Sequence, residues 1–104
     1  MVANRFELKF EWDPVKAEKN WKDHGVTFEQ AATVFLDANL LSRVDDEHGN
    51  DEERWVSLGI DKSARLLVVC HTYREIKQRN ATIRIFSARK STRRETTEYE
   101  KRKP

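Results

Sequence analysis

The polar residues that could take part in chemistry gather near the end of the chain. They follow two apolar runs and continue into a segment with helical spacing. Glu95 and Tyr99 are four residues apart, so they would share one face of a helix. The candidate catalytic residues are His71, Arg74, Arg89, Glu95 and Tyr99, and the candidate phosphate-binding residues are Arg84, Lys90, Arg93 and Arg94.

These residue types match what cleavage of RNA without a metal ion requires. A base must take the proton from the ribose 2′-OH, an acid must protonate the leaving 5′-oxygen, and cations must neutralise the phosphate oxygens in the transition state. His71, Glu95 or Tyr99 could transfer protons, and the sequence does not distinguish the base from the acid. Arginine suits the electrostatic role because its planar guanidinium binds two phosphate oxygens at once; Arg74, Arg89 and Arg94 are the candidates.

Each candidate also has a purely structural interpretation. His71 ends a buried run and could be a hydrogen-bonded core histidine. Tyr99 is the one large apolar side chain of its segment and could anchor that segment to the core. Arg93, Arg94 and Glu98 could be the solvated side of an exposed helix. Both interpretations stay open at the level of sequence.

Several other kinds of site can be excluded by motif. The chain has no glycine-rich phosphate loop, no Cys–His metal spacing and no Gly-x-Ser-x-Gly elbow. The acidic loop around His48 lacks the ligand spacing of a calcium loop. The single cysteine, Cys70, lies inside an apolar run, where we expect a buried, unreactive thiol. We therefore expect neither a metal nor a cofactor.

Length and composition favour one soluble domain over residues 1–104. Hydrophobic residues make up 38% of the chain and charged residues 37%, and the net charge is only +2. The charge is unevenly distributed, because residues 45–53 are acidic and residues 84–103 are rich in Arg and Lys. There is no secretion signal and no apolar run long enough for a membrane span, so we expect a cytoplasmic protein that does not contact membranes.

The N-terminal elements are recognisable by their periodicity. Residues 6–12 alternate between apolar and charged side chains, which predicts a half-buried strand with Phe6, Leu8, Phe10 and Trp12 directed inward. Asp13-Pro14 is a typical helix start, and Gly25 is suited to end that helix after His24. Its apolar face is thin and consists mainly of Val15 and Trp21.

The remaining elements also follow from local patterns. Thr27 and Gln30 form a capping box that opens an amphipathic helix; its apolar face contains Phe28, Ala31, Ala32, Phe35 and Leu36. Strands are expected over residues 40–44, 53–60, 65–72 and 82–87, with 73–81 as a polar hairpin connection. A second capping box, Thr92 to Glu95, opens a last helix that ends near Arg102. This order predicts an α+β fold with an antiparallel sheet, two N-terminal helices and a C-terminal helix.

An ordered series of short motifs resembles the BrnT toxin family. The series begins with Phe10-Glu11-Trp12-Asp13 and Lys22-Asp23-His24-Gly25-Val26-Thr27-Phe28-Glu29-Gln30-Ala31. It continues with Glu53-Arg54-Trp55, Leu67-Val68-Val69, His71-Thr72, Ile83-Arg84-Ile85, Ser87-Ala88-Arg89-Lys90, Thr92-Arg93-Arg94-Glu95 and Tyr99-Glu100. The resemblance extends from about residue 8 to residue 100, and the order and spacing of the pieces make it specific.

The resemblance implies a RelE-like fold and a metal-independent endoribonuclease that arrests growth by cutting RNA. It implies a BrnA-type ribbon-helix-helix antitoxin, two toxins and two antitoxins in a heterotetramer, and contact with operator DNA only through the antitoxin. In such enzymes strand arginines and the C-terminal helix form the active surface, which points to Arg84 or Arg89 and to Tyr99. Two alternatives remain: a non-catalytic binding module or corepressor in an antitoxin complex, and non-specific nucleic-acid binding, which would weaken steeply with salt.

Overall fold

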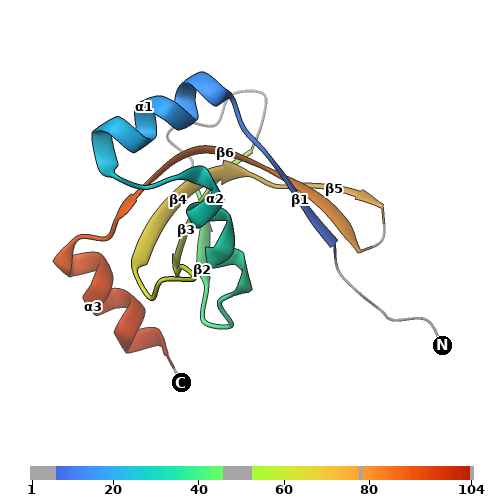
Figure 1. Ribbon diagram of the computed structural model, residues 1–104. Helices are drawn as coiled ribbons and strands as arrows, with labels where there is room; N and C mark the ends of the chain where they lie inside the picture. The colour runs from blue at the N-terminus through green and yellow to red at the C-terminus, as the bar shows by residue number, and fades with distance from the viewer. Residues whose placement is uncertain (1–6, 46–52, 78, 104) are drawn as a thin grey trace.

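The computed structural model describes residues 7–45, 53–77 and 79–103. The predicted position of Phe6 and the acidic loop around His48 lie outside these residues. The described elements are β1 (Glu7–Glu11), α1 (Pro14–His24), α2 (Phe28–Ala32), the 3₁₀ helix η1 (Thr33–Leu36), β2 (Leu41–Val44), β3 (Arg54–Ile60), β4 (Leu66–Thr72), β5 (Arg74–Lys77), β6 (Asn80–Lys90) and α3 (Arg93–Arg102). The predicted α+β class is confirmed (Figure 1).

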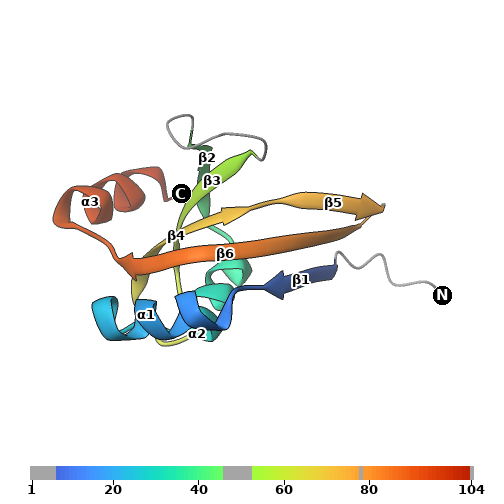
Figure 2. The same ribbon diagram turned by 90° about the horizontal axis from the view of Figure 1, so that it is seen from above.

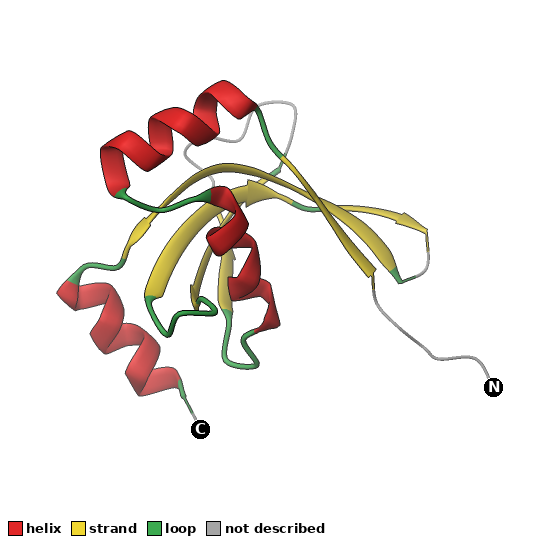
Figure 3. Ribbon diagram, viewed as in Figure 1, coloured by secondary structure: helices red, strands yellow, loops and turns green. Residues whose placement is uncertain are grey.

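The strands form one curved sheet in the order β1-β6-β4-β3-β2, with β5 pairing the first part of β6. The helices α1 and α2 lie on one face, and α3 lies across the other (Figures 2 and 3). The main core fills the space under α1 and α2, and a smaller cluster of Leu58, Val68 and Tyr99 lies under α3. None of the helices in the described ranges is long and apolar enough to cross a membrane.

The expectation of an entirely antiparallel sheet is wrong for one strand pair. β1 runs parallel to β6, with Glu7 opposite Asn80 and Glu11 opposite Arg84. Parallel neighbours need a long crossover connection. In this chain α1, α2 and the strands β2–β5 lie between β1 and β6 in the sequence. No short turn therefore determines whether β1 and β6 run parallel or antiparallel.

The start and end of α1 agree with the sequence patterns, but its buried face does not. The Asp13 side chain accepts a hydrogen bond from the Val15 amide at 2.8 Å, and Gly25 ends the helix with a φ of 67°. Val15 and Trp21, the predicted apolar face, are 75% and 54% exposed. The helix is instead held through Asn20, which is buried between α1 and β6.

The predicted helix after Thr27 changes type halfway. The capping box of Thr27 and Gln30 is present, but α2 ends at Ala32 and the chain continues as the 3₁₀ turn η1. The Thr33 hydroxyl donates to the Gln30 carbonyl at 2.7 Å, within this tighter turn. Because a 3₁₀ helix has three residues per turn, Leu36 leaves the apolar face and is 85% exposed.

The segment predicted as a hairpin connection contains a further strand. All residues of β5 are exposed, so the segment lacks the apolar alternation by which a strand is recognised. β4 and β5 together run beside the long strand β6, which extends from Asn80 to Lys90 instead of 82–87. The register shifts where Cys70 and His71 face Ser87 and Ile85, which makes Phe86 the extra residue of a bulge.

Candidate functional site

The sheet face opposite α1 and α2 carries a row of charged side chains, which we call the open face. Paired residues of neighbouring antiparallel strands lie on one face. Arg74 is opposite Thr82, and Thr82 alternates with Arg84 and Phe86 along β6. Arg89, opposite Val68, lies on the same face beside α3. The charged residues that strand pairing places on the open face include Lys9, Glu11, Arg43, Arg54, Arg74, Arg84 and Arg89.

Two cations lie over one aromatic ring on this face. The guanidinium carbon of Arg54 is 4.6 Å from the centre of the Phe86 ring, and the Lys16 Nζ is 5.4 Å from it. Both distances are within the range of a cation–π interaction. The bulge in β6 places Phe86 where it can hold these cations, which come from β3 and from the first turn of α1.

Arg84 is paired more loosely than Arg89, the other arginine of β6. Its Nη1 lies 3.7 Å from the Glu11 carboxylate, and the two side chains are 43% and 56% exposed. A pair with this separation and exposure contributes little to stability, because water screens it. The guanidinium and the carboxylate are therefore both available to a ligand on the open face.

Arg89 is fixed by Glu95. Its two terminal nitrogens bind the two carboxylate oxygens at 2.8 and 2.9 Å. Glu95 also accepts the Thr92 amide at 2.8 Å, within the predicted capping box of α3. The hydrogen bond from Arg89 is the main cause that lowers the pKa of Glu95 from 4.5 to about 2. Glu95 is thus an ionised positioning residue for Arg89 at neutral pH.

The Arg89–Glu95 pair should make stability depend on pH in a defined window. Because the folded state lowers the pKa of Glu95, the pair stabilises the protein above about pH 4.5, and this contribution is lost as the pH falls toward 2. Glu95→Gln keeps a side chain that can form the capping box, as Gln30 does in α2, but removes the charge. The melting temperature of the variant should be lower than that of the wild type at pH 6 and equal to it near pH 2. An unchanged difference across this range would contradict the assignment.

Tyr99 is the buried anchor of α3. Its side chain is 1% exposed, and its hydroxyl donates to the Asp37 Oδ2 at 2.5 Å. The same carboxylate accepts the amides of Ile60 and Asn39 at 2.9 and 2.8 Å. Burial, together with Asp37, raises the pKa of Tyr99 to about 12. Burial alone would raise the pKa of Asp37, but these hydrogen bonds outweigh it and lower that pKa.

Loss of the Tyr99 hydroxyl should therefore be seen in stability. We expect Tyr99→Phe to lower the free energy of unfolding by about 1–2 kcal/mol, because the half-buried carboxylate of Asp37 loses a donor. Urea unfolding followed by circular dichroism measures this. Tyr73→Phe, at a tyrosine that is 40% exposed, is the matched control and should change stability by much less. Equal effects of the two variants would be inconsistent with an anchoring role.

His71 lies on the opposite face of the sheet from Arg89 and is 3% exposed. Its Nδ1 bonds to the Thr72 carbonyl oxygen at 3.0 Å, so Nδ1 carries a proton. Burial lowers the pKa of His71, which leaves the other nitrogen, Nε2, free to accept a hydrogen bond from the Ser57 hydroxyl at 2.7 Å. The structure thus separates His71 from the arginines with which the sequence grouped it.

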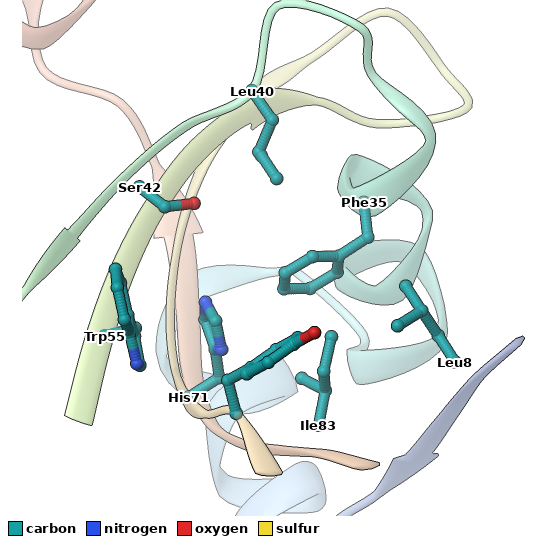
Figure 4. Close-up of a pocket in the computed structure, with 8 residues that line it drawn as sticks. Leu8, Phe35, Leu40, Ser42, Trp55, His71 and Ile83 are labelled. Carbon is teal, nitrogen blue, oxygen red and sulfur yellow. The ribbon is translucent and has the colours of Figure 1, made fainter. Parts of the chain in front are cut away.

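His71 borders a pocket of about 340 Å³ on the face that carries η1. Figure 4 shows Trp55 and His71 side by side, with Phe35 and Leu8 across from them. The ring of Phe35 meets the imidazole edge-on, with centroids 4.8 Å apart. The pocket is lined by Leu8, Phe35, Leu40, Ser42, Trp55, His71, Tyr73 and Ile83.

The other predicted cations lie away from the open face. Lys90 is opposite Leu67, whose side chain belongs to the core under α1 and α2. Arg93 and Arg94 line a shallow surface on the outer side of α3, together with Lys101. Of the predicted site residues, the structure brings Arg74, Arg84, Arg89 and Glu95 to the open face or its border.

Glu11 and Arg54 are open-face residues to which the sequence patterns gave no role. Glu11 looks like one polar member of an alternating strand, and only the parallel pairing with β6 brings it to Arg84. Arg54 was named in a motif but given no role; its position follows from pairing β3 with β4 and from the bulge at Phe86. Neither pairing leaves a local signal in the sequence.

Comparison with known proteins identifies the family of this chain. The family model described as the ribonuclease toxin BrnT of type II toxin–antitoxin systems matches residues 12–95. The crystal structure of the Brucella abortus ribonuclease toxin BrnT is similar in fold, with a TM-score of 0.56 and 16% sequence identity, covering 84% of this chain and 100% of that chain. No curated protein matches the sequence. Because the family model spans most of the chain, this protein belongs to the BrnT family of ribonuclease toxins of type II toxin–antitoxin systems.

Proposed function

We propose that the chain is an endoribonuclease that cleaves RNA on the open face without a metal ion. The observation that carries the proposal is the convergence of four arginines from three strands, Arg54 of β3, Arg74 of β5, and Arg84 and Arg89 of β6, on one accessible surface. Guanidinium groups can bind the phosphate and stabilise the charge that develops on its oxygens. Cleavage by this route needs no Lewis acid, provided that one group accepts the 2′-OH proton and another group or a water molecule protonates the leaving 5′-oxygen.

Glu11 is the side chain that we assign to this proton transfer. Its carboxylate is 56% exposed and lies beside Arg84, so a phosphate held by that guanidinium would bring its ribose close to the carboxylate. His71 faces the other side of the sheet, the Tyr99 hydroxyl is buried against Asp37, and Glu95 is engaged by Arg89. Compared with His71, Glu95 and Tyr99, Glu11 therefore combines exposure with proximity to a loosely paired guanidinium, that of Arg84.

The test is incubation of purified protein with RNA in excess EDTA. We expect cleavage to persist, and we expect Arg84→Ala to reduce the rate by about a hundredfold through loss of transition-state stabilisation. Lys22→Ala is the control, since it removes the same charge from an exposed pair on α1. Cleavage that stops in EDTA and returns with a divalent cation would refute metal independence. A folded protein that leaves RNA intact in either condition would favour the non-catalytic binding module.

The proposed partner is a BrnA-type ribbon-helix-helix antitoxin, with two toxins held by an antitoxin dimer. Membership of a type II family supports an antitoxin protein as partner. In this arrangement the complex contacts operator DNA through the antitoxin, and the free toxin acts on RNA in the cytoplasm. Light scattering of the co-expressed pair would test the stoichiometry.

A further inference from the structure

One of the residues that line the pocket beside His71 carries a buried hydrogen-bond donor that nothing in the described chain satisfies. The indole Nε1 of Trp55 has no hydrogen-bond partner among the described residues. Buried polar groups are nearly always paired, because an unpaired one costs about 1–3 kcal/mol. Trp55 lines the pocket (Figure 4), so a ligand there could supply the missing acceptor.

A series of hydrogen bonds from His71 through Ser57 to Ser42 leaves the Ser42 oxygen as an acceptor at the same pocket. His71 Nδ1 donates to the Thr72 carbonyl, so the Ser57 hydroxyl must donate to His71 Nε2. The Ser42 hydroxyl, 2.7 Å from Ser57, must then donate to the Ser57 oxygen. The proton of Ser42 is thereby committed, and its oxygen is left with free lone pairs to accept a hydrogen bond from a ligand.

The walls of the pocket are suited to a flat, aromatic ligand. Phe35, Trp55 and Tyr73 contribute aromatic rings, and the pocket volume of about 340 Å³ is in the range of small-molecule sites. Nucleobases stack on aromatic side chains and present adjacent donors and acceptors along one edge. An aliphatic side chain of a partner protein would fill the same space but would leave the Trp55 indole N–H unpaired.

The pocket lies one residue away from the open face along β3. Arg54 and Trp55 are neighbours whose side chains project from opposite faces of the sheet, and β3 begins at Arg54. At the adjoining end of β4, Tyr73 belongs both to the pocket and to a shallow depression formed with Glu53, Thr72 and Arg74. A nucleotide strand on the open face could therefore pass around this end of β3.

We propose that this pocket receives one nucleobase of the RNA, with the Trp55 indole as donor and the Ser42 oxygen as acceptor. This inference rests on the proposed ribonuclease function, and it assigns the pocket to substrate selection. A carbonyl of the base accepts from Trp55, and a ring or exocyclic N–H donates to Ser42. Bases that lack this combination on one edge bind less well.

The test follows the indole N–H resonance of Trp55 by NMR. Trp55→Phe identifies the resonance, because the chain has two other tryptophans, Trp12 and Trp21, whose resonances serve as internal controls. The ligands are 2′-O-methyl oligonucleotides, one for each base, which cannot be cleaved through the 2′-oxygen, and the corresponding nucleoside monophosphates. We expect at least one oligonucleotide to shift the Trp55 resonance, and Ser42→Ala to weaken its binding by about tenfold.

The results of this experiment distinguish a failure of the pocket assignment from a failure of the proposed ribonuclease function. Cleavage of RNA by wild-type protein with no shift of Trp55 by any oligonucleotide would overturn the pocket assignment alone. A Trp55 shift without cleavage would overturn the proposed ribonuclease function alone. A shift with free monophosphates but with no oligonucleotide would refute an RNA base as the occupant. A shift only with indole, as an apolar probe, would assign the pocket to an apolar side chain and overturn the proposal. A variant Trp55→Phe that cleaves RNA with the wild-type base preference would also contradict it.

Discussion

Replacing Glu11 by Gln should reduce RNA cleavage by about a hundredfold or more, which is the usual contribution of a general base. Gln keeps the size of the side chain and its place on β1 but cannot accept the 2′-OH proton. The single-turnover rate with saturating RNA is the quantity to measure, because it separates the chemical step from binding. We expect the rate of the variant to fall while its affinity for RNA rises slightly, since Arg84 loses its carboxylate neighbour.

Glu7→Gln provides a matched control for this variant. Glu7 lies on the same strand and has the same exposed position in the alternation, but its partner in β6 is Asn80 and not an arginine. The control should cleave at close to the wild-type rate. If the two variants lose activity equally, the effect comes from the charge of β1 as a whole. If neither loses activity, another group accepts the proton and the assignment of Glu11 is wrong.

Replacing Asn20 by Ala should cost much of the stability of the fold. The Asn20 amide donates to the carbonyls of Val26 and Ala88 at 3.0 and 2.8 Å, and its oxygen accepts the Ala88 amide at 3.0 Å. Beyond Glu11 no strand among the described residues pairs this edge of β6, and the Asn20 side chain forms the hydrogen bonds that a peptide group of a neighbouring strand would form. Ala leaves these buried backbone groups unpaired, so we expect a loss of about 3–5 kcal/mol.

A loss of that size is a large part of the stability of a small domain, which is typically about 5–15 kcal/mol. Urea unfolding measured by circular dichroism gives the value. Lys19→Ala is the neighbouring control, because the Lys19 side chain is exposed and pairs with Asp23 on the surface. A change below about 1 kcal/mol for Asn20→Ala would show that water replaces the lost hydrogen bonds.

The local elements could be predicted from the sequence where a short pattern determines them. Both capping boxes, the Asp13 cap and the left-handed Gly25 are present where their residue types indicated. The buried face of α1 could not be predicted, because hydrophobicity pointed to Val15 and Trp21 while the packing depends on the polar Asn20. Asn20 bonds to Ala88, which is far from it in the sequence, so no local sequence pattern could predict this contact.

The candidate site was only partly predictable for the same reason. Residue type singled out Arg84 and Arg89, and the capping box placed Glu95 at the start of α3. The separation of His71 from these arginines follows from strand alternation together with the bulge in β6, and bulges are not marked by composition. Glu11 joined the site through a parallel pairing between the two ends of the chain.

The attachment of α3 has a consequence for the order in which the molecule comes apart. Tyr99 is the buried residue of this helix, and the helix is tied to the sheet by its bond to Asp37 and by the Arg89–Glu95 pair. The acceptors in these two interactions are the carboxylates of Asp37 and Glu95, whose pKa values are lowered in the folded protein. Strong acid therefore protonates both carboxylates and weakens both interactions together. Segments held by few buried contacts open as separate cooperative units. Acid should therefore detach the C-terminal helix as one unit before the sheet unfolds, and its amides would be the first to lose protection from hydrogen exchange.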